Sequence, residues 1–474
     1  MVGVQVFNRP VDWDNQGFTP APEAGKARLA VMVRLTAEAG ATFVRGGSRT
    51  SEMSSQKNEG WGLFGMTVLL PLLKQYNLAL DWVLDGTYPG NPARGFPSDA
   101  DRSANIVRGG DDYGLPPLRA RWIELVGEGA ALAHAYGVRT MYEMWNEPDV
   151  YDYSKGIVYW RGDKTRYGIL LSDGASAARA KDPNASILNG GLVLGEPDTE
   201  GYMAQAIQAL KDGTITYLAV HHHGAIEQFW AAWDRSRRWT PEIETLRAKV
   251  ILNETGASAG TDHENAVNAV GKLLSAKIIG MAGASIFHIG CLPISMAQGG
   301  VNNDLTKGDP NGDGDFSLVD ANLNPKEGYY ALKTANTMVK GLPPVKNLSD
   351  NQNASGQDRY AFLFGDGSRK VLVGIRQRPT DAEISEAFGS ASYAEYAMDG
   401  AAATPGSDGG GIIYLVSGFV PGTPATPESP NKPTPAPDPG GKSPDEGGSS
   451  GGCNSGLGMI CLAALGAMFW VRKR

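Results

Sequence analysis

Residues 139–149, RTMYEMWNEPD, run from a β-like segment into a turn that carries an acid. The segment as far as Asn146 is rich in apolar residues, so it predicts a buried strand. Glu147 then stands between Asn146 and Pro148, a combination that is not typical of a protein core. An acid at the end of a buried strand suggests a functional residue, and its meaning depends on the fold around it.

The strand at 139–146 is one of eight β-like runs, and amphipathic helical segments separate them. One helical segment, 117–137, ends in Gly137, where a glycine C-cap is expected. This βα alternation predicts an α/β fold, a (β/α)8 TIM barrel at 1–341 with some long loops. The competing doubly wound sheet would need fewer repeats and usually a glycine-rich first turn, which VFNRPVDW lacks. We expect strands at 2–7, 41–47, 78–84, 139–146, 186–193, 217–223, 250–256 and 284–290, and the last helix at 327–341.

Three parts follow the barrel. Short β-like pieces separated by turn residues predict a small C-terminal β-sheet domain at 342–420. Proline at every third position, then glycine and serine, predict a linker at 421–452. Residues 453–474 contain an apolar run and end in Arg-Lys-Arg.

The order of small residues, apolar helix and basic end at 453–474 resembles the GlyGly-CTERM and Synerg-CTERM sorting signals. The resemblance implies contact with the membrane through the C-terminal helix before processing, and an envelope or extracellular location. The alternative is a hydrophobic helix that packs on the globular part. The first ten residues lack the pattern of a secretory signal and predict a first strand instead.

The composition narrows the classes of function. The 474 residues are 42% hydrophobic, enough to bury a large core and form more than one domain. The net charge of −8 comes from interspersed acids and bases, which argues against nucleic acid as a partner. Cys291, Cys453 and Cys461 form neither a disulfide framework nor a CxxC metal pattern, so packing must hold the fold together.

Two acids would lie at the carboxyl ends of barrel strands, where the active sites of this fold are built. Glu147 ends the fourth strand, and Glu254, in VILNETG, ends the seventh. Cleavage of a glycosidic bond needs two such carboxyl groups, because one protonates the leaving oxygen while the other attacks or stabilises the anomeric carbon. Either acid alone could be a solvated surface residue, but the pair in one barrel mouth indicates catalysis.

The segment YEMWNEPD resembles the fourth strand of clan A glycoside hydrolases, most closely family 39, in which a glutamate also stands four residues before the acid/base. AVHHHG resembles the end of that family's sixth strand, where the pattern is His, any residue, Tyr; His221 matches and His223 replaces the tyrosine. The resemblance implies that Glu147 is the general acid/base and Glu254 the nucleophile. It also implies that Asn146 binds the sugar 2-hydroxyl and that Arg45, in FVRGGS, orients the nucleophile.

Other residues have two interpretations each. His221 and His223 share one face of a strand, so they could contact sugar or pair on a metal; without a third ligand of suitable spacing, sugar contact is favoured. His288 could reach the mouth or be a buried, hydrogen-bonded residue. Trp82 is a candidate to stack on a sugar face, or else packs in the core. Glu143, on the same strand face as Glu147, is either a partner of the site or an acid in the barrel core.

A second motif, DPNGDGDFSLVD, occupies 309–320 and has the spacing of a calcium-binding loop. The aspartate at position 12 resembles the dockerin form of the loop, although no second copy follows. The alternative is a flexible Gly/Asp loop. The predicted ligands of a structural calcium are Asp309, Asn311, Asp313, Asp315, Ser317 and Asp320.

These observations predict a retaining glycoside hydrolase that cleaves O-glycosidic bonds in oligo- or polysaccharides by double displacement, with no cofactor for catalysis. We expect Glu147 to hold the proton that the leaving group takes and Glu254 to stay ionised beside Arg45. A separation of ~5 to 5.5 Å between the two carboxyl groups would favour retention, and ~6.5 to 9.5 Å would favour inversion. The alternatives are a surface barrel that binds glycans without turnover and, less in keeping with the carboxylate pair, a structural protein of the envelope.

Overall fold

The computed structural model describes residues 1–5, 23–49, 61–85, 118–152, 157–158, 164–198, 201–257, 261–290, 317–320, 322–349 and 359–418. The predicted linker and C-terminal signal lie outside this range, as does most of the predicted calcium loop. In the described part of the chain, no helix has the length and apolar character needed to cross a bilayer.

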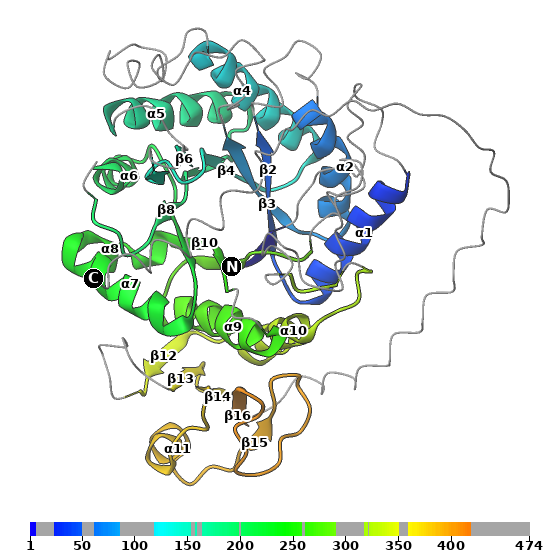
Figure 1. Cartoon of the computed structure of the whole chain (residues 1–474), viewed down its shortest axis with the longest axis vertical. Helices are drawn as coiled ribbons and strands as arrows, with labels where there is room; N and C mark the ends of the chain where they lie inside the picture. The colour runs from blue at the N-terminus through cyan, green and yellow to red at the C-terminus, as the bar shows by residue number, and fades with distance from the viewer. Residues whose placement is uncertain are drawn as a thin grey trace, which may run out of the picture.

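Parallel strands form a barrel, as the βα alternation predicted (Figure 1). The order around the sheet is β7-β4-β3-β2-β1-β11-β10-β9-β8, and a parallel bridge from Leu188 to Tyr217 links β7 to the start of β9. The expected fifth strand is therefore two short strands, interrupted at Gly190 and Gly191. The strands are β1 Val2–Gln5, β2 Phe43–Arg49, β3 Ala79–Asp85, β4 Thr140–Met144, β7 Ser186–Asn189, β8 Leu192–Val193, β9 Leu218–His223, β10 Val250–Gly256 and β11 Gly283–Ile286.

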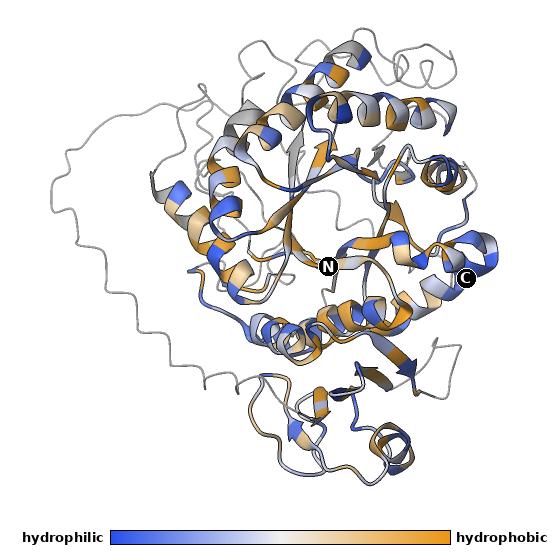
Figure 2. Cartoon of the chain, turned by 180° about the vertical axis from the view of Figure 1, so that it is seen from behind, coloured by the Kyte–Doolittle hydropathy of each residue, from blue (hydrophilic) through white to orange (hydrophobic). Residues whose placement is uncertain are grey.

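Helices surround the barrel, and several carry apolar residues alongside polar ones (Figure 2). Helix α4 ends before Gly137, whose φ of 67° only glycine adopts readily, as the C-cap prediction required. The helices are α1 Glu23–Glu38, α2 Trp61–Gln75, α4 Leu118–Tyr136, α5 Lys164–Lys181, α6 Tyr202–Lys211, α7 Ile226–Trp239, the short α8 Glu242–Thr245, α9 Asp262–Ile279 and α10 Glu327–Val339. A 3-10 turn, Arg247–Lys249, precedes β10, and a small hairpin, β5 Tyr151–Asp152 with β6 Ile157–Val158, follows β4.

The inward-facing side chains of the barrel lie in layers, because alternate residues of a strand face the same side. The lower layer is apolar: Phe43, Met141, Leu188, Ala219 and Ile251 form one buried cluster. Two residues further along β2, β3, β4, β9 and β10, the inward positions are polar, whereas Gly190 stands at that place after β7. This second layer holds Arg45, Asp81, Glu143, His221 and Asn253, all buried. The apolar layer thus supports a polar floor beneath the mouth.

A five-stranded antiparallel sheet follows the barrel, as predicted, in the order β12-β13-β14-β16-β15. Trp230 of α7 stacks on Tyr360 at 6.3 Å and contacts Phe362, so barrel and sheet share a core. Helix α11 Asp381–Phe388 was not predicted; Thr380 and Glu383 form a capping box at its start. The strands are β12 Pro344–Asn347, β13 Tyr360–Gly365, β14 Lys370–Ile375, β15 Ala394–Tyr396 and β16 Ile412–Ser417.

Candidate active site

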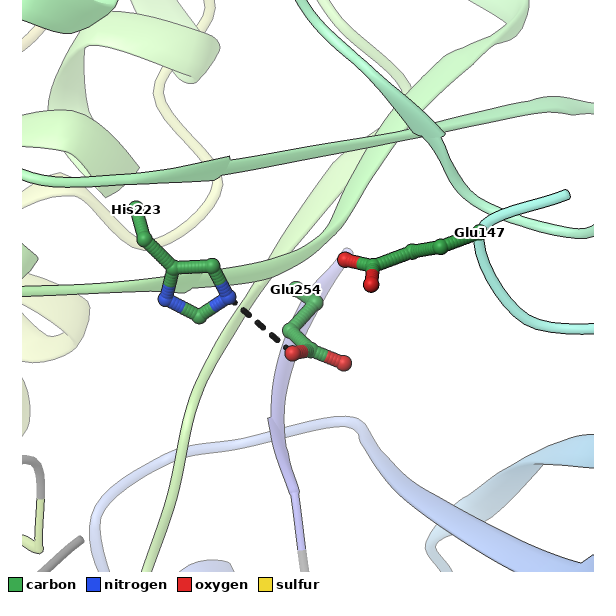
Figure 3. Close-up of side chains that lie close together, drawn as sticks. All are labelled: Glu147, His223 and Glu254. Atoms are coloured by element: carbon green, nitrogen blue, oxygen red, sulfur yellow. Dashed lines mark hydrogen bonds and ion pairs between the residues drawn. The ribbon is translucent and has the colours of Figure 1, made fainter. Parts of the chain in front are cut away.

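The two predicted catalytic acids meet at the carboxyl end of the barrel. Glu147 lies just after β4, and Glu254 lies near the end of β10. One carboxylate oxygen of each, together with a ring nitrogen of His223, lie within 4.8 Å of one another. Figure 3 shows the two carboxylates and the imidazole side by side. The carboxylates are therefore close enough to act on one bond.

A tight turn after β4 positions Glu147. Trp145 and Glu147 both have positive φ, 85° and 46°, which is uncommon for residues with a side chain. The Glu147 carboxylate accepts a hydrogen bond from His221, with Nδ1 and Oε1 2.8 Å apart. The pKa of His221 would be lowered by burial, but the charge of Glu254 and hydrogen bonds to Glu143 and Glu147 raise it to about 10. The raised pKa favours the cationic form of His221 at neutral pH, and its hydrogen bond holds one oxygen of Glu147.

Asp149, two residues further along, was not predicted as part of the site. Its Oδ2 accepts a hydrogen bond of 2.9 Å from the Val193 N–H, which ties the turn to β8. Burial raises the pKa of Asp149 to about 7, and the charge of Glu147 adds to the effect. An acid whose pKa lies near neutrality is therefore only two residues from Glu147.

A bulge in β10 places Glu254. Leu252 pairs with Val220 and Glu254 with His221, so Asn253 is an extra residue in the strand. Glu254 Oε1 lies 3.0 Å from Nε2 of His223, while Arg45 donates to Oε2. Burial would raise the pKa of Glu254, but the positive charges of Arg45 and His221 lower it well below its usual range. This environment keeps Glu254 ionised.

Arg45 connects the two halves of the site. Its Nε and Nη2 donate to both oxygens of Glu143 at 2.8 and 3.0 Å, and Nη2 also donates to Oδ1 of Asn146 at 2.9 Å. Burial would raise the pKa of Glu143, but Arg45 and His221 lower it to about 2. Burial would likewise lower the pKa of Arg45, yet the charges of Glu143 and Glu254 raise it above its usual value. The structure therefore favours the first of the two interpretations of Glu143, that of a buried partner of the site.

Asp81 and Asn253 complete the polar floor and were not predicted. Asn253 Nδ2 donates to Oδ2 of Asp81 at 3.2 Å, and this oxygen lies 4.0 Å from Nε of Arg45. Burial and the nearby charge of Glu143 raise the pKa of Asp81 well above its usual range, which favours its neutral form. The signal in the sequence was one aspartate within an apolar strand, LALDWVL, which did not reveal its partners.

Two glycines make room for the site. The Gly191 N–H donates to Oε1 of Glu143 at 3.0 Å, and a Cβ at this position would overlap Nε2 of His221. A Cβ on Gly190 would lie 2.8 Å from the backbone of Trp145. The glycine pair within a predicted strand, SILNGGLV, was the signal for this close approach.

Lys272 of α9 supports the loops that follow β9 and β10. Its Nζ donates to the carbonyl oxygens of Gly224 at 2.7 Å, Gly256 at 2.6 Å and His222 at 3.4 Å. The side chain is fully buried, and burial lowers its pKa well below the usual value. Lys272 therefore fixes the backbone next to His223 and Glu254.

Other predicted residues lie apart from the mouth or outside the described residues. Trp82 is fully buried and lies over Gly129 of α4, because its neighbour Asp81 takes the inward position; Trp82 therefore does not face a sugar. His288 is fully buried, edge-on to Phe287, whose ring in turn lies edge-on to His223. Of the predicted calcium ligands, Asp309, Asn311, Asp313 and Asp315 lie outside the described residues. Asp320 accepts hydrogen bonds from the backbone of Asn322 and Asn324.

Comparison with known proteins supports the fold. No family model and no curated protein matches the sequence. Solved structures do match, among them a family 39 glycoside hydrolase from Bacteroides cellulosilyticus WH2, with a TM-score of 0.51, 15% identity, and coverage of 88% of this chain and 80% of that one. A GH30 endoxylanase from Clostridium papyrosolvens C71 has a TM-score of 0.54, 14% identity, and coverage of 88% and 96%. A glucosidase from Croceicoccus marinus has a TM-score of 0.50, 11% identity, and coverage of 88% and 99%. At these identities the likeness shows a shared fold.

Proposed function

We propose that this protein is a retaining glycoside hydrolase. The observation that carries the proposal is the pair of carboxylates at the barrel mouth, with oxygens of Glu147 and Glu254 within 4.8 Å of each other. Retaining enzymes hold their two carboxyl groups ~5 to 5.5 Å apart, whereas inverting enzymes leave ~6.5 to 9.5 Å for a water molecule. Oxygens this close are compatible with the retaining distance. The solved structures with the same fold include hydrolases of glycosides, which is consistent with a carbohydrate substrate.

In the first step, Glu254 attacks the anomeric carbon and Glu147 gives its proton to the leaving oxygen. Arg45 and His223 contact the two oxygens of Glu254, so they hold the nucleophile ionised and fix its direction. The glycosidic bond breaks as the bond from Glu254 to the sugar forms. The leaving group departs as an alcohol, and the sugar remains as an ester of Glu254.

In the second step, Glu147 accepts a proton from water, and the resulting hydroxyl group replaces Glu254 at the anomeric carbon. Two inversions at one carbon give net retention. His221 stays hydrogen-bonded to Glu147 and orients it in both steps. Asn146 uses its carbonyl oxygen to accept from Arg45, which leaves its amide N–H groups for the 2-hydroxyl of the sugar.

A panel of aryl glycosides and polysaccharides tests the proposal with purified protein. We expect turnover of at least one sugar, with NMR of the first product showing the configuration of the substrate. Glu254→Ala should abolish turnover. Glu147→Ala should spare substrates with good leaving groups, and azide should rescue it with retained configuration. Binding of glycans without turnover across the panel would favour the non-catalytic barrel, and an inverted product would overturn the retaining mechanism.

A further inference from the structure

A group of metal-ligand type lies in the mouth itself. His223, Glu147 and Glu254 each offer one ligand atom, and these three atoms lie within 4.8 Å of one another (Figure 3). They come from β9, from the turn after β4 and from β10, so the fold brings together residues that lie far apart in the sequence. We propose that these three residues bind a divalent transition-metal ion of the zinc class, in the place that substrate would take.

The spacing suits such an ion. Zinc bonds to nitrogen and oxygen of ~2.0 to 2.2 Å place neighbouring ligands of a tetrahedron roughly 3.4 Å apart. His223 Nε2 and Glu254 Oε1 are already 3.0 Å apart. The Glu147 oxygen lies within 4.8 Å of both atoms, so Glu147 must move closer to complete the set. Three protein ligands then leave the fourth position of the tetrahedron to water.

Two of the three ligands are already oriented by a hydrogen bond to another residue. Arg45 holds one oxygen of Glu254 and His221 holds one oxygen of Glu147, while the ring of His223 lies edge-on to Phe287 at 5.5 Å. Hydrogen-bond partners fix the direction of metal ligands in proteins. The positive charges of Arg45 and His221 both oppose an incoming cation, but each is shared with Glu143, which reduces this repulsion.

The imidazole decides which metals fit. Calcium and magnesium prefer oxygen ligands alone, whereas zinc, nickel and copper accept imidazole nitrogen together with carboxylate. The side chains of Glu147, His223 and Glu254 are 9%, 10% and 12% exposed, so each keeps some contact with solvent. A bound ion would occupy both proposed catalytic carboxylates. Metal binding and glycoside turnover therefore exclude each other, and this consequence alone rests on the proposed function.

Zinc binding is tested directly on the full chain, after treatment with a chelator, by calorimetric titration with Zn²⁺ and separately with Mg²⁺. His223→Gln keeps an N–H that can reach Glu254 but is a poor zinc ligand. We expect its affinity for zinc at this site to fall by at least about 100-fold, more than the ~10 to 100-fold that loss of an outer partner costs. Mg²⁺ should give no saturable heat that depends on these residues.

His263→Gln is the matched control, because His263 also contacts a glutamate, Glu327, at 2.8 Å but on the surface, where the two side chains are 44% and 41% exposed. It should bind zinc as the unmodified protein does. Glu147→Gln provides a second variant in case His223→Gln does not fold, and it should also lose the site. Unchanged zinc stoichiometry and affinity in His223→Gln and Glu147→Gln would overturn the proposal. The titration contains no sugar, so its outcome is independent of whether the protein hydrolyses glycosides.

Discussion

The Glu143→Gln substitution tests how the charges of the polar floor stabilise the barrel. Glu143 is fully buried and accepts two hydrogen bonds from Arg45 and one from the Gly191 N–H. Its pKa lies at about 2 instead of the ordinary 4.5. Each pKa unit corresponds to about 1.4 kcal/mol, so the charge contributes about 3 to 4 kcal/mol to the free energy of unfolding at neutral pH. We expect the free energy of unfolding of Glu143→Gln to be lower than that of the unmodified protein by about the same amount.

The same pKa gives the direction of the pH dependence. Because the folded state holds the pKa of Glu143 below its unfolded value, the contribution is complete above pH 4.5 and is lost as the pH falls towards about 2. Between these limits the free energy of unfolding of the unmodified protein should fall more steeply than that of Glu143→Gln. The two should converge at the acid end of the range.

Urea denaturation at a series of pH values measures both effects, and Glu244→Gln is the control. Glu244 pairs with Arg247 at 3.0 Å, but their side chains are 41% and 47% exposed. Solvent screens such a pair, and its loss should cost less than about 1 kcal/mol. If Glu143→Gln were as stable as Glu244→Gln at pH 7, or as steep in its pH dependence as the unmodified protein, the reasoning about the buried charges would be wrong.

Two further substitutions and the addition of calcium test other parts of the site and the fold. Lys272→Met removes the donor to three backbone carbonyls. The free energy of unfolding, measured by urea denaturation, should fall by at least about 2 kcal/mol. An unchanged midpoint of urea unfolding would show that Lys272 does not support the loops. Asp81→Asn replaces an acid whose raised pKa favours the neutral form, so the substitution should lower the free energy of unfolding by about 1 kcal/mol or less at pH 7. A loss of stability equal to that of Glu143→Gln would mean that Asp81 is charged. Calcium added after chelation should raise the melting temperature, because it binds the loop at 309–320. At a free calcium concentration 100 times the dissociation constant, binding adds about 2.7 kcal/mol to the free energy of unfolding. An unchanged melting temperature would argue against the calcium loop.

Hydrophobic periodicity was sufficient to predict the barrel strands and the last helix, because each strand forms a short apolar run and the helices between them are amphipathic. It could not predict the break at Gly190 and Gly191. A glycine pair inside an apolar run does not show that another strand's side chain, here His221, fills the space that a Cβ would need. Helix α11 was also missed, although the T-x-x-E sequence of Thr380 to Glu383 is a helix-start signal.

The site was predictable where it follows from strand ends, as for Glu147 and Glu254. Contacts across the barrel were not, because the link from Arg45 to Glu143 and the pairing of Asp81 with Asn253 depend on the register of strands that are distant in the sequence. The alternation of strand residues would have corrected the expectation for Trp82. With Arg45 opposite Asp81 on the inner face, the next residue must point outward to the helices.

The central claim is that Glu254 forms a covalent bond to sugar, and mass spectrometry of a trapped intermediate tests it most directly. The reagent is the activated 2-deoxy-2-fluoro derivative of the sugar that the aryl-glycoside panel identifies, since fluorine slows both steps while the activated leaving group speeds only the first. We predict one added glycosyl group on the peptide that contains Glu254, and none in Glu254→Gln. A glycosyl group on Glu147, or a turned-over sugar whose fluoro derivative never labels the protein, would contradict the account.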